Sequence, residues 1–167
     1  MNAMDVPELF EVETNNKWQD TPLERYYTLN NRAKGEQGEN IVQAILESLG
    51  YIVEPRKNSG HDRIVNGVKT EIKFSAATDR NYKWQFTFNH IGFKKDWDEI
   101  IFCGVNGDLN IQMVKYSKDE IPLEFFNRQQ GGESGGNDDF MSFNNKSTQL
   151  LRGGTCIING MEKSNEN

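Results

Sequence analysis

The clearest pattern in the chain is an amphipathic helix followed by a β-hairpin. Residues 33–50, AKGEQGENIVQAILESLG, end at a glycine that suits a helix C-cap. The apolar residues of this run lie at helical spacing: Ile41, Val42, Ile45, Leu46 and Leu49. Further along, Asn66-Gly67 separates two β-rich runs, and both residues tolerate the positive φ angles of a type I′ turn. The pattern predicts a helix packed on a sheet, with a tight hairpin in that sheet.

Other stretches predict shorter elements. Apolar and alternating runs predict strands after Tyr51, over 81–93, 98–105, and in FMSFNN and TCIIN. Asn106-Gly107 predicts a second hairpin leading into LNIQMVKY. Residues 22–30 predict a short helix, and Ser117 and Glu120 are spaced as a capping box for another.

The two-residue turn at Asn66-Gly67 predicts the register of the hairpin. It pairs Val65 with Val68, Ile64 with Lys69 and Arg63 with Thr70. Continued by one step, the register places Asp62 across from Glu71, with Cβ atoms about 4.5–5.5 Å apart. Lys73 shares that face. The opposite face of the hairpin is apolar and carries Val65, Val68, Ile72 and Phe74. We therefore expect the acidic face to turn toward a cleft.

Asp62, Glu71 and Lys73 suggest metal-dependent hydrolysis. Two carboxylates this close repel each other, and a hard divalent cation such as Mg²⁺ relieves the repulsion while keeping waters and substrate phosphate oxygens as ligands. The lysine can orient an attacking water or stabilise charge that develops in the transition state. The alternative is a cross-strand salt-bridge cluster on a solvated face, where such residues are common and contribute little.

Glu39 is a candidate for the same cleft. On the predicted helix it lies at the border of the buried stripe, whereas Glu36 projects toward the polar face. The alternative is an ordinary first-turn glutamate that is favoured by the helix dipole.

The order of these features resembles the PD-(D/E)XK nuclease superfamily, over residues 34–116. The matching parts are a helix with Gly35 and Glu39, a strand after Tyr51, Asp62 at the start of the next strand, and Glu71-Ile72-Lys73 as the E-x-K element. The residue before the aspartate is His61, where the pattern of the family often has proline.

The resemblance implies an α/β (α+β) fold with a restriction endonuclease-like core. Its mixed central sheet would be flanked by helices in the order α-β-β-β-α-β. Asp62, Glu71 and the carbonyl of Ile72 would ligate Mg²⁺, for which Mn²⁺ is expected to substitute, and Glu39 would add a ligand or hold a water. Lys73 would act on the water that attacks the phosphodiester in line, without a covalent intermediate.

Five residues are candidates for contact with nucleic acid. These are Lys57, Asn58, His61, Lys83 and Gln85. His61 is also the one alternative base near the metal ligands, although a structural role or a phosphate contact suits it better, because it neighbours Asp62 on a strand. The aromatic run over 81–93 that contains Lys83 and Gln85 is first of all the pattern of a half-buried strand.

Length and composition fit one domain over residues 1–167. The chain is 35% hydrophobic and 26% charged, on the polar side of the globular average. We expect a core over about 33–125, a flexible glycine-rich loop over 127–139 and a disordered tail over 161–167.

Net charge argues against a nucleic-acid enzyme, but its distribution does not. The formal net charge is −6, whereas a DNA-binding domain usually carries a basic face. Residues 56–95 contain nine basic and three acidic residues, a local charge of +6. A positive region around the predicted site can bind a phosphate backbone, and the alternative is basic residues that simply alternate on solvated faces.

The remaining features concern the compartment of the cell. No apolar run approaches membrane-spanning length, and the first residues are acidic where a signal peptide has basic residues. We therefore expect a cytoplasmic protein. Cys103 and Cys156 have no metal-ligand spacing to a partner, so we expect two reduced, buried thiols.

These observations predict a magnesium-dependent endodeoxyribonuclease, a hydrolase of DNA phosphodiester bonds that resembles a type II restriction enzyme. We expect a homodimer if it cuts both strands, with DNA as partner, no membrane association and no nucleotide cofactor. The alternatives are a DNA repair or junction-resolving nuclease, or a non-catalytic DNA-binding or regulatory module that keeps the nuclease fold.

Overall fold

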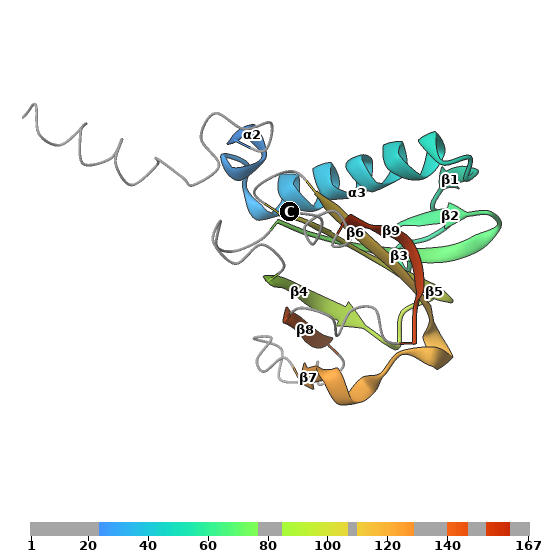
Figure 1. The fold of residues 1–167 in the computed structure, drawn as a ribbon. Helices are drawn as coiled ribbons and strands as arrows, with labels where there is room; N and C mark the ends of the chain where they lie inside the picture. The colour runs from blue at the N-terminus through green and yellow to red at the C-terminus, as the bar shows by residue number, and fades with distance from the viewer. Residues whose placement is uncertain (1–23, 77–84, 107–109, 129–139, 147–152, 161–167) are drawn as a thin grey trace, which may run out of the picture. The chain divides into compact units, whose positions relative to one another are not determined.

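The structure is a computed structural model that describes residues 24–76, 85–106, 110–128, 140–146 and 153–160 (Figure 1). Contacts within the chain divide it into two units, Met1–Gln37 and Gly38–Asn167. The first unit contains α2 (Glu24–Tyr27), which confirms the short helix predicted over 22–30, and the start of α3 (Asn31–Ser48). The second unit contains the rest of α3 and every strand of the described residues.

Helix α3 confirms the predicted amphipathic helix and begins two residues earlier than expected. The side chain of Asn30 caps it, because its Oδ1 accepts a hydrogen bond from the main-chain N–H of Ala33 over 2.9 Å. Gly50 ends it with a φ of 92°, and Tyr51 N–H donates to the carbonyl of Leu46, as in a Schellman motif. Leu49, expected in the buried stripe, follows the last helical residue and is 49% exposed, so that expectation is wrong.

The central sheet is mixed, as predicted. Its order is β1-β2-β3-β5-β6-β9 (Figure 1). Strand β3 pairs with β5 in parallel, and all other neighbours are antiparallel. The strands are β1 (Val53–Pro55), β2 (Arg63–Val65), β3 (Val68–Ala76), β5 (Glu99–Val105), β6 (Ile111–Ser117) and β9 (Thr155–Asn159).

A second sheet has the order β4-β8-β7. Its strands are β4 (Gln85–Gly92), β8 (Phe140–Lys146) and β7 (Phe126–Arg128). Strand β4 lies where the order α-β-β-β-α-β requires a helix, between the parallel strands β3 and β5. The described residues of that connection, 85–98, include the strand that was predicted over 81–93 and contain no helix. The cause is the alternating aromatic pattern, since Phe86 and Phe88 are both buried on β4.

Both faces of β3 are covered. On one face Gly38 of α3 packs on Phe74 so closely that a Cβ at Gly38 would lie 2.6 Å from the Cβ of Phe74. On the other face Thr87 of β4 donates its main-chain N–H to Ser75 Oγ over 3.3 Å. Since Glu71 shares the face of Ser75, it lies under cover and is only 5% exposed.

Several smaller predictions can be compared with the structure. The second hairpin is confirmed, because β5 and β6 pair in an antiparallel ladder, although its connection is five residues long from Asn106 to Asn110. A 3-10 helix, η1 (Lys118–Glu120), follows β6, and a second one is η2 (Leu123–Phe125). The side chain of Ser117 makes no capping hydrogen bond, so the expected capping box is not formed.

Two further expectations are corrected. Cys103 is a buried free thiol as expected, but Cys156, on β9 at the end of the strand order, is exposed. The glycine-rich loop was expected to begin at Asn127, yet Asn127 and Arg128 belong to β7. The rest of that loop and the tail over 161–167 lie outside the described residues.

Within the described residues, no helix combines the length and the apolar character that crossing a membrane requires.

Candidate active site

The hairpin between β2 and β3 has the predicted register. Its pairs are Arg63 with Thr70, Ile64 with Lys69 and Val65 with Val68. Asn66 and Gly67 both have positive φ, at 48° and 82°, as a type I′ turn requires. The local turn chemistry therefore positions the strand that carries Glu71 and Lys73.

The side chain of Asp62 bonds to β3 just beyond the end of the β2–β3 ladder. The ladder stops at Arg63, one residue short of the expected pair between Asp62 and Glu71. Asp62 donates its main-chain N–H to the carbonyl of Thr70 over 3.0 Å, so it shares that partner residue with Arg63. Its carboxylate oxygen Oδ2 accepts the main-chain N–H of Ile72 over 2.8 Å. The carboxylate thus replaces a main-chain acceptor and is fixed at the edge of β3.

Three carboxyl groups meet at this edge. Burial, and then hydrogen bonding to Asp62 and the charge of Asp62, raise the pKa of Glu71 to about 8. Burial, and then the charge and hydrogen bonding of Asp62, raise the pKa of Glu39 to about 7. Without a metal ion, Glu71 therefore keeps its proton at neutral pH.

Asp62 is the ionised member of this cluster. Burial raises its pKa, but hydrogen bonds from Glu71, from the N–H of Ile72 and from Glu39, together with the charge of Lys73, outweigh burial and lower the pKa below its ordinary value. The cluster therefore concentrates one negative charge on the central carboxylate, with Glu39 and Glu71 on either side as hydrogen-bond donors.

Lys73 lies two residues after Glu71 on β3, and its charge reaches both carboxyl groups of the hairpin. It lowers the pKa of Asp62 and of Glu71. Lys73 is half-buried, whereas Ile72 between them is buried and faces α3. The E-x-K element thus places a cation and a carboxyl group on one face of the strand, as the sequence predicts.

Arg63 connects the cluster to α3. Its Nη1 donates to Glu39 Oε2 over 3.2 Å and to the carbonyl of Asp62 over 2.8 Å. Its Nε donates to Gln43 Oε1 over 2.9 Å, and its Nη2 to Asn40 Oδ1 over 3.2 Å. One guanidinium therefore binds two successive turns of the helix and holds Glu39 beside Asp62.

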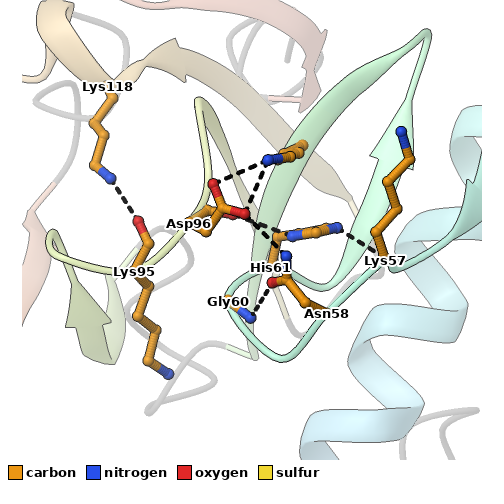
Figure 2. A network of polar contacts seen from close by, with 8 residues as sticks. Lys57, Asn58, Gly60, His61, Lys95, Asp96 and Lys118 are labelled. Carbon is orange, nitrogen blue, oxygen red and sulfur yellow. Dashed lines mark hydrogen bonds and ion pairs between the residues drawn. The ribbon is translucent and has the colours of Figure 1, made fainter.

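His61 is a buried structural residue. Only 1% of it is exposed. Its Nε2 accepts the main-chain N–H of Lys57 over 3.0 Å, so Nδ1 carries the proton and donates to the carbonyl of Asp96 over 3.1 Å (Figure 2). With both ring nitrogens engaged, this arrangement leaves neither one to act as a base or to contact a phosphate.

The other predicted nucleic-acid contacts are not brought together at the cluster. The amide of Asn58 donates to Asp96 Oδ2 over 2.9 Å and accepts the N–H of Gly60 over 2.7 Å (Figure 2). Lys57 is exposed on the same loop. Gln85 opens β4, where its main chain pairs with Lys146 of β8, and Lys83 lies outside the described residues.

Sequence analysis missed Arg63 and Lys95, which affect the carboxyl cluster, and Asp96, which binds His61 next to Asp62. Arg63 is adjacent to Asp62, which is the one signal that could have found it. Lys95 lies on the turn between β4 and β5, and its charge lowers the pKa of Glu71. Nothing in the local pattern connects that turn to residues 62–73.

The cluster suits a hard cation by donor type. As the side chains lie, no three His, Cys, Asp or Glu residues in the described part of the chain form a group that could hold a metal ion. The oxygen atoms of Asp62, Glu71 and Glu39 are nevertheless the ligands that Mg²⁺ prefers, and they already interact with one another. An ion would have to replace the protons of Glu71 and Glu39, and the carboxylates would have to turn toward it.

Comparison with known proteins finds no family model that matches the chain and no match among curated proteins. What these side chains can do chemically is therefore inferred from their own geometry.

Proposed function

We propose that this protein is a magnesium-dependent endodeoxyribonuclease with a restriction endonuclease-like, PD-(D/E)XK fold. The observation that carries the proposal is the meeting of Glu39, Asp62 and Glu71 at the edge of β3, with Lys73 on the same strand. Buried carboxyl groups with strongly shifted pKa values are typical of functional sites, and their oxygens are the ligands that a hard divalent cation prefers. The mixed sheet with the parallel pair β3–β5 supports the proposed fold.

Asp62, Glu71, the carbonyl of Ile72 and Glu39 would hold the ion. When bound, Mg²⁺ would polarise a phosphoryl oxygen and lower the pKa of a bound water; Mn²⁺ would substitute. Because Glu71 holds a proton at neutral pH, ion binding would release protons and strengthen as the pH rises. Arg63 would keep Glu39 oriented toward the ion site during this exchange.

Lys73 would act on the attacking water and on the charge that develops at phosphorus. It lies on the same face of β3 as Glu71, and its charge lowers the pKa of both Asp62 and Glu71. Attack in line by water, without a covalent intermediate, needs only these groups and the ion. A homodimer would cut both strands of a duplex in one complex.

Cleavage of supercoiled plasmid tests this function. Wild-type protein should cut with Mg²⁺ and not with EDTA, and Lys73→Ala should lower the rate by about a hundredfold or more. Lys115→Ala is the matched control, because Lys115 is a half-buried lysine of the same sheet that lies 3.8 Å from the carboxylate of Glu99. This control should cut at the wild-type rate.

The products distinguish the related activities. Discrete bands would indicate a restriction-type enzyme, whereas cutting confined to branched or damaged duplexes would indicate a junction-resolving or repair nuclease. Folded wild-type protein that cuts no DNA with Mg²⁺ or Mn²⁺ would overturn the proposed activity. Binding of DNA without cutting would then favour the non-catalytic module.

A further inference from the structure

The turn between β4 and β5 is fastened to the loop that precedes Asp62. Asp96 is the centre of the contact (Figure 2). Its carboxylate accepts the ammonium of Lys69 over 2.9 and 3.1 Å and the amide of Asn58 over 2.9 Å. Its carbonyl accepts Nδ1 of the buried His61 over 3.1 Å. The turn is therefore held by two hydrogen bonds to the loop, from Asn58 and His61, and by two more to Lys69 of β3.

The same turn is held on its other side. Trp97 is 1% exposed and donates its indole N–H to the carbonyl of Gly92 over 2.7 Å. The ammonium of Lys118 lies 4.4 Å from the centre of the Trp97 ring and donates to the carbonyl of Lys95 over 2.7 Å. A turn fixed from both sides gives Lys95 a defined main-chain position.

The side chain of Lys95 runs along Gly92 and not toward the residues that are hydrogen-bonded to Asp96. Its Cγ, Cδ and Cε lie 3.2–3.3 Å from the position of a Cβ at Gly92, so the stem runs along this glycine. In Figure 2 the ammonium points away from Asp96 and His61. The charge of Lys95 lowers the pKa of Glu71, and so does the charge of Lys73.

We propose that Lys95 is a second cation of the active site and binds a phosphate group of the DNA backbone beside the acidic cluster. The inference rests on the proposed function, since it assigns a substrate contact at the same site. An exposed ammonium on a rigid turn gives a charge-assisted hydrogen bond to phosphate with little loss of conformational freedom. The hydrogen bonds of Asp96 to the buried His61 and to Asn58 position the main chain of this lysine relative to Asp62.

Salt-dependent DNA binding tests the inference with a readout other than cleavage. We would measure fluorescence anisotropy of a labelled duplex with Ca²⁺ in place of Mg²⁺ over a range of salt. Lys95→Gln should weaken binding several-fold and reduce the slope of log K against log salt by about one. Lys95→Arg should restore the slope. Lys94→Gln, which makes the same charge change at the exposed neighbouring residue, should keep the wild-type slope.

The outcomes separate this inference from the proposed nuclease activity. Equal slopes for wild type and Lys95→Gln, or equal losses for Lys94→Gln and Lys95→Gln, would overturn the role of Lys95. Wild-type protein that binds no DNA would also overturn it. If the protein binds DNA with the expected slopes of log K against log salt but does not cut it, Lys95 remains a phosphate contact. Only the nuclease activity is then contradicted.

Discussion

The guanidinium of Arg63 lies 3.2 Å from the carboxylate of Glu39, and the same nitrogen donates to the carbonyl of Asp62 over 2.8 Å. The pair is partly buried, with 18% of the Arg63 side chain and 26% of the Glu39 side chain exposed. Arg63 therefore joins the hairpin to α3 at the point where the three carboxyl groups meet.

Replacing Arg63 should lower the stability of the folded protein. Arg63→Met would leave Glu39, Asn40 and Gln43 without their donor, and we expect the free energy of unfolding to fall by about 2–3 kcal/mol. Arg63→Lys should recover only part of the loss, because an ammonium cannot match the geometry of the guanidinium. Urea unfolding measures both. Arg56→Met, at an exposed arginine, is the control; an equal loss there would contradict the role of Arg63.

His61 gives a second test of how Asp62 is positioned. His61→Ala removes the partner of the Lys57 N–H and of the Asp96 carbonyl and leaves a cavity, so the free energy of unfolding should fall by about 2–4 kcal/mol. His90→Asn is the comparison, because His90 is exposed with a φ of 56° that asparagine tolerates. A smaller loss for His61→Ala than for His90→Asn would show that the hydrogen bonds of His61 do not hold the loop.

The contact of α3 with β3 can be tested by a matched pair of glycines. A Cβ at Gly38 would lie 2.6 Å from Phe74, so Gly38→Ala should cost about 1–3 kcal/mol of stability. A Cβ at Gly35 meets nothing within 4 Å, and Gly35→Ala should stabilise by about 0.5–1 kcal/mol through helix propensity. Thermal unfolding of both variants would reveal the opposite signs, and equal shifts would contradict the close packing on Phe74.

The raised pKa of Glu71 predicts a pH dependence of stability in metal-free protein. Between its ordinary pKa of 4.5 and about 8, the folded state keeps a proton that the unfolded state has lost. The folded state then binds more protons, so the stabilisation falls as the pH rises through this window. Glu39 acts in the same direction, whereas the lowered pKa of Asp62 acts oppositely and only at acid pH.

Urea unfolding between about pH 5 and pH 8 measures this dependence, with a slope of at most about 1.4 kcal/mol per pH unit for each group. Glu71→Gln should flatten the slope, because glutamine cannot ionise. Mg²⁺ should oppose the loss of stability by binding the ionised form. A slope that is unchanged in Glu71→Gln would mean that Glu71 titrates at its ordinary pKa.

The hairpin was predictable because its determinants are local. Asn66-Gly67 sets the turn and hence the pairs up to Arg63 and Thr70, and the period of apolar residues sets α3. A helical wheel also placed Glu39 at the border of the buried stripe of the helix, where its side chain could approach Asp62. These features need only the geometry of one element or of two adjacent strands.

The rest depends on contacts between distant segments. The carboxylate of Asp62 accepts the N–H of Ile72 because the ladder ends early, and the path of the preceding loop decides where it ends. That path is set by His61 and Asp96, which are 35 residues apart in the sequence. The alternating aromatic residues predicted strand β4 itself, but no local pattern reveals that Phe86 of this strand packs against Gly104 of β5.

The most direct measurement is cleavage of supercoiled plasmid by wild-type protein and Glu71→Gln under single-turnover conditions, with Mg²⁺ and with EDTA. Glutamine keeps the size and the hydrogen bonding of a protonated glutamic acid but cannot become a metal ligand of the same charge. We expect the wild type to cut only with Mg²⁺ and the variant to lose about a hundredfold or more in rate while remaining folded. Cutting in EDTA, or cutting by Glu71→Gln at the wild-type rate, would contradict a magnesium nuclease built on this carboxyl cluster.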